Sequence, residues 1–148
     1  MNLFLSGGTG LGKTFLSTCI AKVVSEKGFS VVYDTAISVF AKYEECKFSR
    51  LSDDADSAQA DIRRMESCDL LILDDLGTEM GSSFVISALY SLINTRLTSG
   101  KKTIISSNLS VDDISGRYGA PIYSRLKGEY FELKFAGSDI RLIKGTVE

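Results

Sequence analysis

The sequence predicts an α/β fold in which a parallel sheet carries helices on both faces. Short apolar segments alternate with amphipathic segments of helical length along its 148 residues. A glycine-rich turn joins the first apolar segment to the first amphipathic one. A later run of four apolar residues, typical of a central strand buried on both faces, ends in two carboxylates.

The glycine-rich turn, SGGTGLGKTF at Ser6–Phe15, has the composition of a phosphate-binding loop. Gly7, Gly12, Lys13 and Thr14 fill the fixed positions of the pattern G-x-x-x-x-G-K-S/T. Glycines let consecutive backbone N–H groups point at one anion, and the dipole of the following helix favours the same charge. A glycine-rich turn without a ligand is the alternative, and the strand before and helix after it argue against that.

Each part of this loop has an expected task. Lys13 is expected to reach the β- and γ-phosphates of ATP, and the Thr14 hydroxyl to hold Mg²⁺. The residues expected to contact the nucleotide are Gly7, Gly8, Thr9, Gly10, Leu11, Gly12, Lys13, Thr14 and Phe15.

The chain begins with a strand and an amphipathic helix. Asn2–Ser6 is apolar and predicts a buried strand. Phe15–Lys27 predicts a helix with Leu16, Ile20 and Val23 on one face.

A second strand, a helix and a polar stretch follow. Phe29–Asp34 is rich in β-branched residues and predicts a strand, and Thr35–Phe48 predicts a helix. Ser52–Ser67 is polar, and we expect only its second half to be helical. The segment at 51–59 is expected to be a mobile surface turn whose acids form a solvated face rather than a metal site.

The middle of the chain holds the most apolar strand, Asp69–Asp75. After the loop Leu76–Gly81, a serine at or near Ser83 is expected to cap a long helix that ends at Ser99. The apolar face of that helix should comprise Val85, Leu89, Leu92 and Ile93.

The last third predicts two more strands around two short helices. Lys101–Asn108 and Tyr130–Phe135 read as strands, and Ser110–Gly116 and Pro121–Lys127 as helices. Residues 137–148 are expected to be a tail. We find no linker or repeat, so residues 1–148 are expected to form one domain.

Polar side chains follow three of the predicted strands. Because ligands bind at the carboxyl ends of parallel strands, the glycine-rich loop, Asp74–Asp75 and Asn108 should meet in one site. Asp74 is expected to hold Mg²⁺ through its water shell, beside Thr14. Asp75 would orient or deprotonate the attacking water, and Asn108 would bind the γ-phosphate or that water. A capped loop start and a simple chain turn remain the structural alternatives.

Arg125 is the strongest candidate for a cation that meets charge developing on the γ-phosphate, often in a neighbouring molecule. A plain surface arginine is the alternative. Arg117 and Arg141 are weaker candidates of the same kind.

Composition excludes several function classes. The chain has no histidine, which excludes catalytic triads with a histidine base and histidine-ligated zinc. Its net charge of −2 gives no overall attraction to nucleic acid. Three scattered cysteines, no membrane-spanning run and no signal peptide lead us to expect a cytoplasmic protein with reduced thiols and no membrane partner.

Five segments together resemble a known family. They are NLFLSGGTGLGKTFL, LLILDDLGTE, TIISSNLS, RYGAPIYSRL and the F-x-G-x-D-I-R run at Phe135–Arg141. This set resembles the ATPase domain of the DnaC/DnaI bacterial helicase loaders and of their relative IstB, a transposition helper, all of the AAA+ class. The D-D-L-G-T-E segment is specific to this branch, and Asp75 stands where most AAA+ proteins have glutamate.

The resemblance implies a P-loop NTPase three-layer α/β/α sandwich: an AAA+ core with sheet order 5-1-4-3-2 and no helical lid. It implies a slow, Mg²⁺-dependent ATPase, and a switch that assembles around single-stranded DNA and helps to load the replicative DNA helicase. Asn108 would be the sensor-1 residue, Arg125 an arginine finger acting on a neighbour, and Arg141 a second sensor. The helicase-binding N-terminal domain of the loaders is absent from residues 1–148.

Other functions compete with this interpretation. They are an IstB-like transposition helper, a small-molecule kinase, and an interaction module that binds nucleotide with little hydrolysis. A GTPase is disfavoured because no N/T-K-x-D segment is present. The cations that could contact single-stranded DNA are Lys101, Lys102, Arg117, Arg125, Lys127 and Lys144.

Overall fold

A computed structural model describes residues 1–49 and 52–137, which form five strands and six helices. The strands are β1 (Asn2–Gly7), β2 (Val31–Thr35), β3 (Leu70–Leu76), β4 (Lys102–Ser107) and β5 (Tyr130–Phe135). The helices are α1 (Lys13–Glu26), α2 (Ala36–Phe48), α3 (Ser52–Ser67), α4 (Ser83–Thr98), α5 (Val111–Tyr118) and α6 (Ala120–Glu129). Most bounds lie within two residues of the predicted ones.

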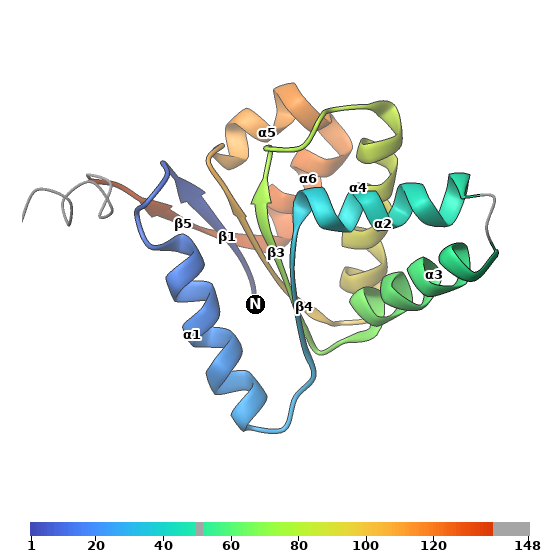
Figure 1. The fold of residues 1–148 in the computed structure, drawn as a ribbon. Helices are drawn as coiled ribbons and strands as arrows, with labels where there is room; N and C mark the ends of the chain where they lie inside the picture. The colour runs from blue at the N-terminus through green and yellow to red at the C-terminus, as the bar shows by residue number, and fades with distance from the viewer. Residues whose placement is uncertain (50–51, 138–148) are drawn as a thin grey trace, which may run out of the picture.

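The strands form one parallel sheet in the order β2-β3-β4-β1-β5. This is the predicted order 5-1-4-3-2 read from the opposite edge. Helices cover both faces, with α1 on one side and the other five helices on the other (Figure 1). The three-layer P-loop fold is therefore confirmed.

The central strand β3 is buried on both faces, as its four consecutive apolar residues predict. Leu70 and Ile72 pack in the cluster beneath α1, whereas Leu71 and Leu73 pack in the larger core on the other face. All four side chains are at most 5% exposed. A strand in this position needs no polar residue until it nears the edge of the sheet, and its first polar residue is Asp74.

Helix α1 packs on the sheet through Leu16, Ile20 and Val24. The prediction that Val23 shares this face is wrong, because Val23 is 52% exposed. Consecutive residues of a helix point about 100° apart, so the face that follows the i, i+4 ridge takes Val24 and leaves Val23 in solvent.

The expected turn at 51–59 is also wrong from Ser52 onward, because α3 is helical over Ser52–Ser67 (residue 51 lies outside the described part). Ala58, Ile62 and Met65 lie on the buried side of α3, at helical spacing. Asp53 and Asp54 are exposed in its first turn, where negative charge stabilises the helix dipole. Tertiary packing of one narrow apolar stripe thus makes a polar segment helical.

Helix α4 carries the predicted apolar face, since Val85, Leu89, Leu92 and Ile93 are each at most 3% exposed. Its cap is Ser82, whose hydroxyl accepts a hydrogen bond from the Val85 N–H at 3.1 Å. The proposed second sensor Arg141 and the cation Lys144 lie outside the described residues.

Candidate functional site

A cavity of about 490 Å³ lies at the carboxyl edge of the sheet, where β1, β3 and β4 end. The end of β3, the start of α1 and the loops beside them supply its lining: Thr9, Gly10, Gly12, Lys13, Thr14, Asp75, Thr78 and Asn108. The strand ends therefore meet in one place, as the parallel topology predicts. Four residues expected to contact nucleotide are outside this lining: Gly7, Gly8, Leu11 and Phe15.

Gly7 and Gly12 of the glycine-rich loop have positive φ angles. Gly12 precedes α1 with a φ of 99°, and it has no side chain that could cap the first amides of the helix. Gly7 has a φ of 140°, and a Cβ there would lie 2.3 Å from the Phe135 carbonyl oxygen. Glycine at position 7 is thus required by the close approach of β5, in addition to any ligand.

The Lys13 ammonium is held inside the loop. The side chain is 6% exposed, and Nζ donates to the carbonyl oxygens of Gly7 and Gly8 at 2.6 Å each. It also lies 3.4 Å from Asn108 Oδ1. A cation in this position, next to the amides that open α1, is suited to the phosphates of a nucleotide.

Asn108 links the glycine-rich loop to the end of β4. Its Oδ1 accepts from Lys13, and its Nδ2 donates to Thr9 Oγ1 at 3.4 Å. The side chain is exposed and lines the cavity. An amide in this place can contact a terminal phosphate or a water beside it.

The Asp74 carboxylate is 3% exposed and receives hydrogen bonds on both oxygens. Oδ1 accepts from the Ser106 hydroxyl and from the Asp75 N–H, the latter at 3.1 Å. Oδ2 accepts from Thr14 Oγ1 at 3.1 Å and from the Tyr33 hydroxyl. These donors hold the carboxylate in one orientation, with Oδ2 toward Thr14.

Asp75 is turned into the cavity by an irregularity in the sheet. The β3–β4 register changes between Leu73, opposite Ile105, and Leu76, opposite Ser107, so β3 holds one extra residue there. Asp75 has a φ of 56°, and among the described residues it alone has a positive φ without being glycine. The bulge buries Asp74 and leaves the Asp75 side chain exposed at the cavity.

The donor set fits a magnesium ion. Hydroxyl and carboxylate oxygens are hard ligands, and Mg²⁺ takes only one or two protein groups besides phosphate and water. Thr14 Oγ1 and Asp74 Oδ2 lie side by side at the edge of the cavity, 3.1 Å apart. These two residues are the ones that would hold the ion.

Comparison with known proteins identifies the family. A family model described as IstB-like ATP binding protein matches residues 1–124. The chain belongs to this family.

Relatives of this IstB-like chain include replication proteins. The replicative helicase loader DnaI of Bacillus subtilis (strain 168) is 31% identical over 137 residues, which cover 90% of this chain and 40% of DnaI. The chromosomal replication initiator protein DnaA of Gluconobacter oxydans (strain 621H) is 28% identical over 142 residues, covering 90% of this chain and 28% of DnaA. The chain thus spans less than half the length of these two relatives.

A solved relative shows the fold. The structure of AMPPCP-bound DnaA from Aquifex aeolicus superposes with a TM-score of 0.75 at 23% identity, covering 98% of this chain and 44% of that one. Within the described part of the IstB-like chain, none of the helices has the length and apolarity that crossing a membrane requires.

Tyr33 and a buried cluster around Glu79 were missed by sequence reasoning. Burial, together with the bond to Asp74, raises the pKa of Tyr33 above its usual range, so its hydroxyl remains a donor at neutral pH. Glu79 is 7% exposed and accepts from the Gly77 N–H at 2.8 Å and from the Tyr118 hydroxyl. Arg117 donates to the Glu79 carbonyl.

This cluster supports the loop that carries Asp75 and Thr78, and it connects that loop to α5. Glu79 is part of the D-D-L-G-T-E segment, and this segment was the sequence feature that could have indicated a role for Glu79. The contact with Tyr118 spans 39 residues and could not be anticipated from sequence.

Arg125 is not brought to the cavity. It is exposed on α6 and lines a shallow hollow of about 280 Å³ with Asn94, Leu97, Thr98 and Glu129. Arg117, the weaker candidate, is engaged with Glu79. Within one chain, therefore, neither guanidinium faces the glycine-rich loop.

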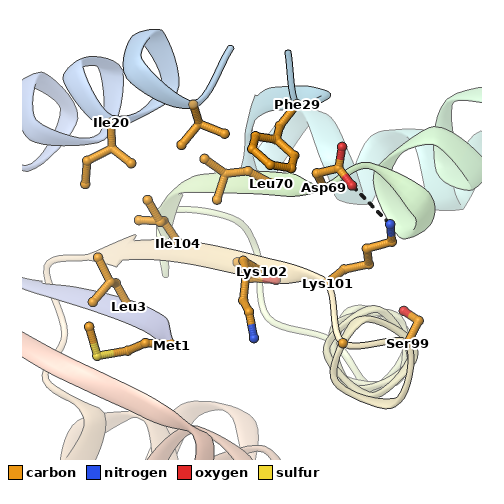
Figure 2. Close-up of a pocket in the computed structure, with 13 residues that line it drawn as sticks. Met1, Leu3, Ile20, Phe29, Asp69, Leu70, Ser99, Lys101, Lys102 and Ile104 are labelled. Carbon is orange, nitrogen blue, oxygen red and sulfur yellow. Dashed lines mark hydrogen bonds and ion pairs between the residues drawn. The ribbon is translucent and has the colours of Figure 1, made fainter. Parts of the chain in front are cut away.

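A second cavity, of about 470 Å³, lies at the opposite edge of the sheet (Figure 2). Its walls are mainly apolar and include Leu3, Ile20 and Ile104, with the Asp69–Lys101 ion pair at its rim. Among the described helices, only α1 covers this face of the five-stranded sheet, which leaves several apolar side chains partly covered. The second cavity lacks the convergent polar groups of the first cavity.

Proposed function

We propose that this chain is a Mg²⁺-dependent ATPase domain that acts as an ATP-controlled switch in loading the replicative DNA helicase. The observation that carries the proposal is the meeting of Lys13, the Thr14–Asp74 pair, Asp75 and Asn108 at one cavity. Membership of an ATP-binding family supports the nucleotide, and the relationship to DnaI supports the process.

The proposed reaction is transfer of the γ-phosphoryl group of ATP to water. The loop amides and the Lys13 ammonium bind the phosphates, and Thr14 with Asp74 would hold Mg²⁺. When bound, the ion neutralises charge on the phosphate oxygens. Asp75 orients the attacking water and accepts its proton, and Asn108 positions the terminal phosphate.

We propose that Arg125 completes the site of a neighbouring copy. An exposed guanidinium remote from its own cavity can contact a γ-phosphate only in another molecule. Hydrolysis would then depend on assembly, as expected for a switch. Single-stranded DNA is the proposed surface on which copies assemble.

The second candidate function is assistance to DNA transposition. The description of the matched family as IstB-like favours it. The two functions share ATP chemistry and differ in partner. Stimulation of ATP hydrolysis by the replicative helicase, with no response to a transposase, would favour loading; the reverse would favour transposition.

The direct test replaces the ammonium at the loop. Lys13→Ala should weaken ATP binding about 10- to 100-fold, because charge-assisted bonds to the phosphates are lost. Isothermal titration calorimetry with Mg·ATP and Mg·GTP measures both the affinity and the choice of base.

Lys22→Ala is the matched control, because Lys22 lies on the same helix with a 76% exposed side chain. It should bind ATP as the unaltered chain does. Undiminished ATP affinity in a folded Lys13→Ala protein would contradict the proposed site.

A further inference from the structure

Tyr33 places a phenol hydroxyl at the candidate magnesium site, and the reaction proposed above makes no use of it. The residue lies on the edge strand β2, opposite Ile72 of β3. Its hydroxyl donates to Asp74 Oδ2, two residues further along β3. Tyr33 is 44% exposed, so its side chain approaches Asp74 from the solvent side.

The Asp74 carboxylate has a full set of donors. An ionised carboxylate offers about four lone-pair positions. Two are taken at Oδ1, by the Ser106 hydroxyl and the Asp75 N–H, and Thr14 Oγ1 also lies 3.5 Å from this oxygen. Two are taken at Oδ2, by Thr14 and Tyr33. A water bound to a metal at this site could therefore reach Asp74 only by displacing one of them.

The four donors differ in their freedom to leave. Ser106 is 0% exposed within β4, and the Asp75 N–H is fixed by the backbone of the bulge. Thr14 belongs to the candidate metal site itself. Tyr33 has a long side chain and is 44% exposed, so it can rotate into solvent and keep its hydroxyl hydrated.

We propose that the Tyr33 hydroxyl is a gate on the magnesium site, because it occupies the Asp74 oxygen beside Thr14 and must withdraw before metal-bound water can bind there. This inference rests on the proposed ATP function. Tyr33 acts through Asp74, so it is a positioning residue. Its effect is to lower the affinity for Mg·ATP relative to metal-free ATP.

The test removes the hydroxyl and retains the ring. For Tyr33→Phe, the dissociation constant of a non-hydrolysable ATP analogue is measured by calorimetry in EDTA and in saturating Mg²⁺. The dissociation constant in EDTA divided by the constant in Mg²⁺ reports the contribution of the metal. We expect this ratio to rise about tenfold, the low end for a hydrogen bond to a charged group, with the metal-free constant little changed.

Two matched variants isolate the cause. Tyr123→Phe removes a hydroxyl that donates to Asp112 at 3.3 Å on the helices α5 and α6, and it should leave the ratio unchanged. Ser106→Ala vacates a position on Oδ1, which is the oxygen farther from Thr14 Oγ1 (3.5 Å, against 3.1 Å for Oδ2), and it should not raise the ratio. Thermal unfolding establishes that each variant is folded.

The outcomes separate the two proposals. An unchanged or lower ratio in folded Tyr33→Phe, with the analogue still bound, overturns the gate and leaves the ATP function standing. An equal rise in Ser106→Ala also overturns the gate, because the effect would then not depend on the oxygen beside Thr14. If the unaltered chain binds no analogue in either condition, the proposed function itself fails.

Discussion

Asp75 shows how much the direction of one side chain depends on its neighbours. Two adjacent carboxylates follow the same strand, yet one is buried against Thr14 and the other faces the cavity. The bulge and the left-handed backbone at Asp75 separate them. Aspartate and asparagine tolerate that conformation better than most residues, so the strain is small.

Asp75→Asn should therefore keep the backbone and remove only the base. We expect ATP hydrolysis to fall about 100-fold or more, the usual contribution of a general base, while ATP affinity stays within twofold. Single-turnover hydrolysis and calorimetry measure the two effects separately. An equal loss in both would mean that Asp75 has a structural role in the nucleotide site.

At the scale of elements, a buried arginine joins α4 to the starts of β3 and β4. Arg96 is 1% exposed and donates to the carbonyls of Met65, Cys68 and Lys102 at 2.6–3.0 Å. Its Nε donates to Thr103 Oγ1 at 2.9 Å. Desolvation by burial lowers the pKa of Arg96, and the carbonyl oxygens at the end of α3 compensate by accepting hydrogen bonds from its guanidinium.

Arg96→Met should cost about 3 kcal/mol or more of unfolding free energy, because several buried carbonyls lose their donor together. Urea unfolding measures this loss. Arg63→Met is the control, because Arg63 is exposed on α3 and its replacement should change stability by less than about 0.5 kcal/mol. Equal midpoints for the two variants would contradict the role assigned to Arg96.

Asp69 contacts residues at the starts of the neighbouring strands, and we expect its ionised carboxylate to make a contribution to stability that is lost in acid. The Ser30 N–H, at 2.9 Å, and then Lys101, at 3.1 Å, lower the pKa of Asp69 to about 2 (Figure 2 shows the lysine contact). A carboxyl whose pKa is lower in the folded state stabilises the fold above the unfolded pKa of about 4. That stabilisation is lost as the pH falls through about 2.

NMR titration of the Asp69 carboxyl carbon should give a midpoint near 2. In Asp69→Asn, the part of the acid destabilisation between pH 4 and 2 that depends on this group should disappear. A midpoint near 4 in the folded protein would show that the Ser30 and Lys101 contacts do not persist in solution.

At the scale of the whole molecule, the helices are distributed unequally. Among the described helices, one covers one face of the sheet and five cover the other. The candidate site, the apolar cavity and Arg125 lie in separate regions, because their linings share no residue. The separation of Arg125 from its own cavity makes assembly a requirement of the proposed mechanism.

Arg125→Ala should leave ATP affinity at high dilution unchanged, because within the described part of one chain Arg125 is not among the residues that line the candidate site. In assemblies on single-stranded DNA, we expect hydrolysis to fall about 1,000-fold, the low end for an arginine supplied by a neighbour. Arg63→Ala is the control, because Arg63 is an exposed arginine on α3 and is not among the candidate contacts to single-stranded DNA. Weaker ATP binding by dilute Arg125→Ala would rule out action in a neighbour.

The sequence by itself determined the class of fold, the parallel sheet and the polar residues that meet at the candidate site. Lys13, Thr14, Asp74 and Asn108 each follow or precede a recognisable strand, and parallel strands bring such positions to one edge whatever the packing details are. The local sequence pattern was sufficient here, because the order of strands and helices along the chain already places these residues at the same edge of the sheet.

Only the tertiary structure decided which neighbours those residues have. The helical form of the first half of α3, the exposure of Val23 and the opposite directions of Asp74 and Asp75 depend on packing between elements. The Tyr33–Asp74 contact joins residues 41 positions apart. Periodicity and spacing describe only nearby residues of the chain, so contacts between distant segments are outside what they can predict.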